Sequence, residues 1–328
     1  MTFNVHNTQD YLSQEALDYL RQNDCQVRFR KWEGLPDQEA VMCREIRGVH
    51  AVIAGGEDYT RKVFEAADRL KIVARTGAGY EHVDLGAARG FGVWVTNTPG
   101  ATGSAVAEFT VGLILSLLRN IHGMASSMKH GKWEKYQGRE LGGLALGVVG
   151  TGSIGKHLIR LASGFGTRIL AYDTQPESAL VAKWKMEYLP LDDLMAQSDI
   201  VSINVPLNGG TRGMIDDRRL GLMKRTAYLV NTSRAAVVDR EALLRMLRED
   251  QIAGAALDVH DPAPCLPDDP LASLENVLAT PWSAFNTQEA IERMSIEAAR
   301  DVVGVLLGRE PEHPVGELEA VRTDIAGP

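Results

Sequence analysis

The stretch Leu146-Gly147-Val148-Val149-Gly150-Thr151-Gly152-Ser153-Ile154-Gly155 decides the fold of this chain. A short apolar run leads into the pattern G-x-G-x-x-G, and residues 156–165 then carry apolar side chains at helical spacing. A strand that enters a glycine-rich turn and continues as a helix is typical of a dinucleotide-binding site. Gly150 permits the tight turn, Gly152 lets the backbone approach a pyrophosphate, and Gly155 lets helix and strand pack closely. The helix N-terminus offers free N–H groups to the phosphates.

A second predicted strand, residues 168–172, ends at Asp173. This acid lies about 20 residues after the glycines, where a carboxylate accepts hydrogen bonds from the adenosine ribose. Residues 174–176 read Thr-Gln-Pro, so no adjacent cation is present to neutralise a 2′-phosphate. The sequence therefore predicts NAD rather than NADP. The alternative is a structural glycine turn that binds no ligand, and the strand that follows the turn and helix argues against it.

Length and composition limit the possible classes of protein. A chain of 328 residues is expected to form about two domains. An apolar content of 45% and a charged content of 24% are those of a soluble globular protein. The net charge of −8 argues against nucleic acid or an anionic membrane as a partner. Three cysteines without a CxxC motif favour a reducing compartment, and we expect a cytoplasmic protein because no secretory signal or long apolar run is visible.

Strand-like and helix-like segments alternate on both sides of the fingerprint. Before it, strands are predicted at 26–30, 50–54, 71–75 and 92–96, and helices at 14–21 and 61–70. After it, strands are predicted at 198–205, 226–231, 252–259 and 276–279, with helices at 240–248 and from 287 to about 307. This alternation predicts a doubly wound parallel sheet, which binds ligands beyond the carboxyl ends of its strands. The helix predicted at 104–120 is apolar nearly all round, so we expect it to be buried between domains or in a dimer interface.

Two charged residues stand at predicted strand ends. Arg234 follows a strand and a turn, and its planar fork suits a carboxylate, although a surface arginine is the alternative. Asp258 ends a strand of small and apolar residues, where a carboxylate needs a partner such as the nicotinamide amide; a cap or loop partner is the alternative. No H-E-x-x-H motif and no Cys/His cluster at ligand spacing occurs, so no metal is expected.

Several motifs in a fixed order resemble the D-isomer-specific 2-hydroxyacid dehydrogenase family over almost the whole chain. The motifs are Val73-Ala-Arg-Thr-Gly-Ala-Gly-Tyr80 with Asp84, Asn97-Thr-Pro-Gly-Ala101 with Ala105-Val-Ala-Glu108, the fingerprint, Val205-Pro-Leu207, Val230-Asn-Thr-Ser-Arg234 with Val238-Asp239, Ala255-Ala-Leu-Asp-Val259 and Thr280-Pro281.

This resemblance implies an α/β fold of two Rossmann-like domains. A smaller flavodoxin-like substrate-binding domain is expected over residues 1–101 plus 291–328, and an NAD-binding domain with a doubly wound parallel sheet over 102–290. The resemblance also implies a homodimer joined largely through helices of the nucleotide domain, and a small anionic substrate.

The resemblance further implies the roles of particular residues. Ala78 and Gly79 would hold the substrate carboxylate through backbone N–H groups, Arg234 would bind the carboxylate and carbonyl as the catalytic residue, and Asp258 would face the nicotinamide. Trp282 is expected beside both substrate and cofactor. The full set expected at the cofactor is Thr102, Gly150, Gly152, Ser153, Ile154, Gly155, Asp173, Val205, Pro206, Thr211, Thr232, Ser233, Asp258, Trp282 and Ala284.

The chain departs from the family at the proton relay. The family has a histidine in T-P-H, held by a glutamate in D-V-F-x-x-E-P, whereas this chain has Trp282 and Ala263 in those two positions. Ala235 and Phe285 also replace glycines, which predicts a bulkier and more aromatic cleft floor. Because indole is a hydrogen-bond donor without acid–base function near neutral pH, Trp282 cannot replace the histidine chemically.

Three interpretations follow from this departure. Another group, with His260 and Asp261 nearest in sequence, could supply the proton. Alternatively, the reaction needs a hydride but no strong acid, as in oxidation of a formate-like anion or reduction of a cationic imine. In the third interpretation, the protein binds NAD(H) without turnover and acts as a redox sensor. Retention of Arg234 and of the NAD-binding set favours an NAD-dependent oxidoreductase that acts on a 2-oxo or 2-hydroxy acid.

Overall fold

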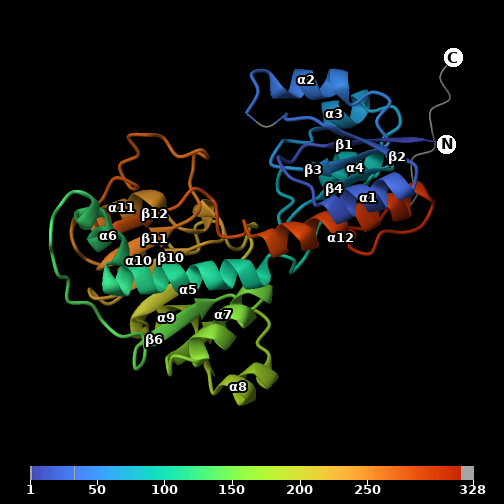
Figure 1. Cartoon of the computed structure of the whole chain (residues 1–328). Helices are drawn as coiled ribbons and strands as arrows, with labels where there is room; N and C mark the ends of the chain where they lie inside the picture. Colours follow the sequence, from blue (N-terminus) through green and yellow to red (C-terminus); the bar gives the residue numbers. More distant parts are fainter. Residues whose placement is uncertain (1, 33, 319–328) are drawn as a thin grey trace. The chain divides into compact units, whose positions relative to one another are not determined.

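The computed structural model describes residues 2–32 and 34–318. The chain divides into two compact units, shown in Figure 1. Unit 1 comprises Met1–Thr102 and Thr287–Pro328, and unit 2 comprises Gly103–Asn286. The substrate-binding and NAD-binding roles expected for the two parts of the chain stay predictions.

Unit 1 is built on a five-stranded parallel sheet with the order β2-β1-β3-β4-β5. This is the order of flavodoxin-like sheets, as predicted. Its elements are β1 (Phe3–Asn7), α1 (Gln14–Gln22), β2 (Cys25–Phe29), α2 (Gln38–Glu45), β3 (Ala51–Ala54), α3 (Arg61–Ala66), β4 (Ile72–Arg75), α4 (Leu85–Gly90), β5 (Trp94–Thr96) and α12 (Gln288–Leu306). One apolar core joins the sheet to α1 and α12, and a second joins it to α2, α3 and α4, so helices cover both faces.

Three elements of unit 1 were not predicted from the sequence. Strand β1 pairs with both β2 and β3, so it is an interior strand of the sheet. Its sequence FNVHN lacks an apolar run because two of its buried side chains, His6 and Asn7, are polar. Helices α2 and α4 are short and were also missed. The helix expected at 61–70 ends at Ala66, because Ala67 is in the extended region.

Unit 2 is built on a seven-stranded parallel sheet with the order β12-β11-β10-β9-β6-β7-β8. Strands β7 and β8 are added on one side of β6, and β9 to β12 are added on its other side. This change of side at β6 confirms the predicted doubly wound architecture. The elements are α5 (Gly103–Arg119), α6 (Ile121–Lys129), β6 (Ala145–Val149), α7 (Ser153–Ser163), β7 (Arg168–Tyr172), α8 (Ser178–Trp184), β8 (Glu187–Tyr188), α9 (Leu191–Gln197), β9 (Ile200–Ile203), α10 (Asp217–Leu220), β10 (Tyr228–Asn231), a 3-10 turn (Ala235–Val237), α11 (Arg240–Arg248), β11 (Gly254–Leu257) and β12 (Val277–Ala279). Helices α6, α8, α9 and α10 and strand β8 were not predicted.

The apolar helix α5 contributes to the core of unit 2. It packs on α7 and on strands β10 and β11, and its buried side chains join those of α7 in one apolar cluster. The expected burial of this helix is therefore confirmed, and within unit 2 it arises from packing on α7 and the sheet, whereas its place between domains or in a dimer interface stays a prediction. Its apolar surface is wide because one side faces α7 and another faces the sheet. Among residues 2–32 and 34–318, no single helix has the length and hydrophobicity of a membrane span; only α5 and α6 taken together, with a 69° bend between them, pass that test.

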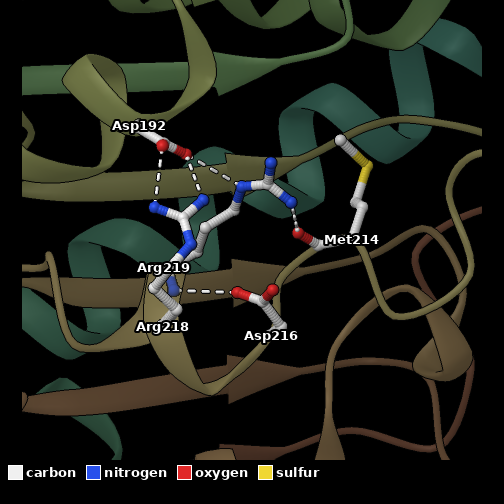
Figure 2. A network of polar contacts seen from close by, with 5 residues as sticks. All are labelled: Asp192, Met214, Asp216, Arg218 and Arg219. Carbon is white, nitrogen blue, oxygen red and sulfur yellow. Dashed lines mark hydrogen bonds and ion pairs between the residues drawn. The ribbon is translucent and has the colours of Figure 1, made fainter.

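A polar network fixes α10 against α9 on the other face of this sheet (Figure 2). The carboxylate of Asp192 accepts hydrogen bonds from both terminal nitrogens of Arg218, at 2.8 and 3.0 Å, and from Nε of Arg219 at 3.0 Å. Arg219 also donates to the carbonyl of Met214 at 2.6 Å, and its backbone N–H donates to the capping carboxylate of Asp216. The two arginines lower the pKa of Asp192 from 3.8 to about 2.

Candidate functional site: a glycine turn and the strand ends of unit 2

The glycine turn between β6 and α7 has the backbone that the fingerprint predicts. Gly150 has φ of +94°, a conformation that other residues rarely adopt, and a Cβ there would lie 2.9 Å from the carbonyl oxygen of Asn204. A Cβ on Gly155 would lie 2.1 Å from the carbonyl oxygen of Gly150. Only glycine therefore fits at these two positions, because turn, helix and strand approach one another so closely.

Gly152 has a different environment from the other two glycines. It is the N-cap residue of α7, and a Cβ placed on it would meet nothing within 4 Å. The space in front of the helix N-terminus is therefore open, and the N–H groups of the first turn of α7 face it. Open space beside unpaired N–H groups and a positive helix end fits a pyrophosphate group. Ser153 and Ile154 begin α7 in this first turn.

Asp173 follows the last residue of β7 and is held beside the glycine turn. Its Oδ2 accepts hydrogen bonds from the backbone N–H of Thr151 at 2.7 Å and from the Thr151 hydroxyl at 3.0 Å, and its Oδ1 accepts one from Gln175 N at 2.9 Å. Partial burial opposes ionisation, but the hydrogen bonds from Gln175 and Thr151 outweigh it and lower the pKa of Asp173. The carboxylate is thus ionised and fixed, as the acceptor of a ribose hydroxyl must be.

The loops after β9 and β10 carry further residues of the expected cofactor set. Val205 and Pro206 follow β9, and the hydroxyl of Thr211 donates to the carbonyl of Pro206 at 2.6 Å, which closes the loop between them. Thr232 and Ser233 follow β10 and are nearly buried. These residues lie at the carboxyl edge of the sheet, where doubly wound sheets bind ligands.

Arg234 lies beside the indole of Trp282. The guanidinium carbon is 5.5 Å from the centre of the ring, within the range of a cation–π contact. Asn231 fixes the backbone of the arginine, because its Nδ2 donates to the carbonyl of Arg234 at 2.9 Å while its Oδ1 accepts from Ser233 N at 3.0 Å. Trp282 is 40% exposed and has φ of +52°, a strained value for a bulky residue. Both side chains are thus presented from turns that follow strands.

The carboxylate of Asp258 lies at the end of β11, and the residue is 1% exposed. It accepts hydrogen bonds from the Thr280 hydroxyl at 2.6 Å, from Ser283 N at 2.9 Å and from Ala284 N at 2.9 Å. The carboxylate therefore organises the turn that carries Trp282. This is the loop-partner alternative considered for it, and a contact with nicotinamide stays a prediction.

The groups considered as substitute proton donors lie in the loop after β11. A ring nitrogen of His260, Nε2, lies 2.8 Å from the carbonyl oxygen of Thr280, so this nitrogen is engaged with the backbone. Asp261 and Ala263 are both exposed. The roles of His260 and Asp261 as proton donors stay predictions.

Three residues expected at the site belong to unit 1. Ala78 and Gly79 form the turn after β4, and Thr102 is the last residue of the first segment of unit 1. Thr102 precedes Gly103, where a Cβ would lie 2.3 Å from the Ser153 hydroxyl, so the chain enters α5 in close contact with the start of α7. The other expected residues, from Gly150 to Ala284, belong to unit 2.

Several residues that shape the site were missed by sequence reasoning. Thr151 occupies a variable position of the glycine pattern yet fixes Asp173, and Asn231 and Thr280 hold the backbone of Arg234 and the carboxylate of Asp258. A short polar residue at or within two residues of the end of a buried strand is the available signal, because such residues cap turns. Among the described residues, no group of three or more His, Cys, Asp or Glu side chains could hold a metal ion.

The chain is similar to known proteins both in sequence and in fold. Residues 111–284 match the family model described as the NAD-binding domain of D-isomer-specific 2-hydroxyacid dehydrogenases. A glyoxylate reductase of Thermofilum pendens is 40% identical over 301 residues, which cover 88% of this chain and 87% of that protein. A hydroxypyruvate reductase of Thermotoga maritima is 39% identical over 258 residues, covering 76% of this chain and 82% of that protein. Among solved structures, the TT0316 protein of Thermus thermophilus superimposes with a TM-score of 0.87 at 34% identity, covering 96% of this chain and all of that one.

Proposed function

The chain belongs to the D-isomer-specific 2-hydroxyacid dehydrogenase family of nicotinamide-dependent oxidoreductases, and we propose that it transfers a hydride to or from a small 2-oxo or 2-hydroxy acid, or a related anion. The observation that carries this proposal is the placement of Arg234, a cation that is presented from a strand end and steadied by Asn231 and Trp282. A fixed guanidinium binds a carboxylate through two parallel hydrogen bonds. The names of the similar proteins, glyoxylate and hydroxypyruvate reductase, support a substrate of this size.

A nicotinamide dinucleotide, when bound, gives or takes the hydride. The residues proposed to hold it are the glycine turn, with its open space at Gly152, and the carboxylate of Asp173. We propose NAD(H) rather than NADP(H), because a fixed, ionised carboxylate repels a 2′-phosphate. The ammonium group of Lys156, on α7, lies 2.5 Å from a carboxylate oxygen of Glu177. Because this ion pair already neutralises the lysine, we do not propose Lys156 as the partner of a 2′-phosphate.

The proton that a ketone reduction requires must come from an unusual source. The positions of the family's relay histidine and its glutamate are occupied by Trp282 and Ala263, neither of which exchanges a proton near neutral pH. A positioned acid typically contributes about 10²–10⁴-fold to such a reaction. We therefore propose that reduction of common 2-oxo acids is slow, or uses a donor such as His260 or Asp261.

The contact between Trp282 and Arg234 favours a second candidate function. An indole beside the guanidinium supplies no acid, which suits a hydride transfer without a general acid, as with a formate-like anion or a cationic imine. If no substrate is turned over at all, the protein would bind NAD(H) and act as a sensor of redox state.

We further propose that the protein is a cytoplasmic homodimer. Beyond α5, large apolar side chains are exposed on α6 and the segment that follows it: Ile121, Met128, Trp133 and Tyr136, with exposures of 50%, 54%, 80% and 52%. An exposed apolar patch on one segment is typical of a protein–protein contact. The three cysteines are free thiols, which suits a reducing compartment.

Steady-state assays test the proposed function. The purified protein is supplied with NADH and either glyoxylate, hydroxypyruvate or pyruvate, and with NAD and formate or the corresponding hydroxy acids, while NADH absorbance is followed. Turnover of any of these supports the oxidoreductase proposal, and the ranking of substrates separates the two candidates. NADH binding without turnover of any of them would instead favour the sensor.

A further inference from the structure

The turn after β4 in unit 1 has three successive carbonyls tied to the protein. The carbonyl of Gly77 accepts a hydrogen bond from Thr98 N at 3.0 Å. The carbonyl of Ala78 accepts one from the side-chain amide of Asn97 at 2.8 Å. The carbonyl of Gly79 accepts one from Nε of Arg75 at 3.2 Å. Three successive peptide planes are therefore fixed.

Fixing a carbonyl also fixes the N–H group of the same peptide, because the two point in opposite directions across a trans peptide bond. The N–H groups of Ala78, Gly79 and Tyr80 consequently point away from Thr98, Asn97 and Arg75. None of these three N–H groups has an acceptor in the part of the chain that the structure describes. Ala78 and Tyr80 are exposed and Gly79 is partly exposed, so the turn lies at the surface of unit 1.

Successive unpaired N–H groups in a turn form a concavity that binds anions. We propose that Asn97 and Arg75 are positioning residues that hold this turn as a three-donor site for the substrate carboxylate, with the N–H of Tyr80 as the third donor. This inference rests on the proposed function for the identity of the anion. It assigns the preparation of the site to two side chains that need not touch the anion.

Arg75 is suited to this role by its burial. The residue is 8% exposed, and its Nε is engaged with Gly79, so it acts from beneath the turn. Its Nη1 is buried and has no hydrogen-bond partner among the described residues. A buried cation that contacts the turn makes the turn more attractive to an anion. Asn97 holds the neighbouring peptide from a partly exposed position, so it is the safer residue to replace.

The change Asn97→Leu removes the amide donor without adding charge. We expect the KM for glyoxylate at saturating NADH, and the Kd of the NADH complex for oxalate, to rise roughly tenfold or more, because a hydrogen bond to a charged group depends on the orientation of the donor. The kcat should change only a few-fold and the Kd for NADH not at all. Asn97→Gln keeps an amide donor and should retain most of the affinity.

Asn4→Leu is the matched control. The side-chain amide of Asn4 also donates to a backbone carbonyl, that of Gly48 at 3.1 Å, but in a part of unit 1 outside this turn. This variant should leave KM and both Kd values unchanged. A third measurement titrates oxalate into the ¹⁵N-labelled protein with NADH, where the amide signals of Ala78, Gly79 and Tyr80 should move most.

The outcomes separate the two proposals. Oxalate binding that depends on Asn97, without turnover of any oxo acid, supports the anion site and contradicts the proposed reductase. Normal turnover with an unchanged KM and oxalate Kd in Asn97→Leu overturns the positioning role while the proposed function stands. Absence of oxalate binding in the parent protein, or unmoved amide signals in the turn, also overturns it.

Discussion

The guanidinium carbon of Arg234 lies 5.5 Å from the centre of the Trp282 ring, and both residues are presented by turns at the carboxyl edge of the same parallel sheet. A contact of this kind is worth about 0.5–2 kcal/mol and restricts the guanidinium to one side of the indole. Arg234 also donates to the carbonyl of Ser233 at 2.7 Å. These two contacts restrict the orientation of the arginine, so in the proposed function Trp282 would position Arg234.

Replacing the arginine tests its role as an anion clamp. Arg234→Ala should leave NADH affinity nearly intact and abolish binding of small 2-oxo acids, since loss of a charge-assisted bidentate contact costs about 2–5 kcal/mol. Calorimetry with oxalate and NADH measures both affinities. Arg212→Ala, which removes an exposed arginine after β9, is the control and should change neither. Unchanged oxalate affinity in Arg234→Ala would show that the clamp lies elsewhere.

Cofactor preference is predicted from the hydrogen bonds of Asp173. The parent protein should bind NADH more tightly than NADPH, because the carboxylate is ionised and fixed by Thr151. Asp173→Ala should weaken NADH binding and narrow the difference between the two cofactors. Thermal shift and fluorescence titrations with both cofactors give the ratio. Equal or tighter binding of NADPH by the parent protein is incompatible with this assignment.

The proposal that Trp282 and Ala263 occupy the positions of the family's proton relay predicts a non-additive double variant. Trp282→His alone gives an imidazole that no carboxylate orients, and Ala263→Glu alone gives a carboxylate with nothing to orient. Together they should raise 2-oxo-acid reduction by more than the product of the single effects, because residues that act as a unit are non-additive. The measurement is kcat/KM for glyoxylate and hydroxypyruvate in all four proteins.

The turnover rate of the parent protein with 2-oxo acids tests, independently of the variants, whether a proton donor is missing. A parent rate on the order of 10 s⁻¹ with a common 2-oxo acid would mean that another acid already serves the reaction. His260→Ala and Asp261→Ala, made singly, would then identify it. Phe285, which stands where the family has a glycine, could limit the gain of the double variant by crowding the new imidazole.

A buried histidine predicts the response of stability to mild acid. Burial, and then the charges of Arg30 and Arg28, lower the pKa of His6 from 6.5 to about 4, against an opposing effect of Glu45. As the pH falls, His6 therefore becomes protonated near pH 6.5 in the unfolded chain but only near pH 4 in the folded chain. Titration of His6 therefore leaves the free energy of unfolding unchanged above pH 6.5 and lowers it by at most roughly 3 kcal/mol as the pH approaches 4.

Chemical denaturation between pH 7.5 and about 4.5 measures this slope. His6→Phe keeps a ring that can pack edge-on against Trp32, which lies 5.7 Å from His6 between ring centroids, but removes the titration. Its stability should depend less on pH over this interval than that of the parent. A matched change at an exposed histidine, His130→Phe, should leave the slope as it is in the parent. Parallel slopes for the parent and His6→Phe would contradict the prediction.

The network in Figure 2 predicts a second effect at lower pH. Arg218 and Arg219 lower the pKa of Asp192 to about 2, so its stabilising effect is present above pH 4 and is lost as the pH falls towards 2. Asp192→Asn should lower the melting temperature slightly at pH 7, and the difference from the parent should shrink in acid and in high salt, because all three side chains are partly exposed. The neighbouring Asp193→Asn, a residue for which no ion pair is found in the described chain, is the control.

The sequence by itself determined the architecture and the family. In the glycine pattern, Gly150 is required by its left-handed backbone and Gly155 by the close packing of helix and turn. The alternation of segments is readable because the strands are short apolar runs and the helices carry apolar residues at helical spacing. These signals repeat over a few residues and can be read without knowledge of distant contacts. The parallel sheets, the doubly wound order of unit 2 and the membership of the dehydrogenase family were predicted on this basis and are confirmed.

The tertiary structure decided what depends on contacts between distant residues. Strand β1 could not be predicted because His6 and Asn7 are polar, and only pairing with β2 and β3 makes them interior. The contacts of the side chains that orient the candidate site could not be predicted from the sequence either. Asn97 reaches the carbonyl of Ala78 across 19 residues, and Arg234 meets Trp282 from a different strand end. Hydrogen-bond direction and ring contact follow from how strands are placed side by side, and no local periodicity in the sequence encodes that placement.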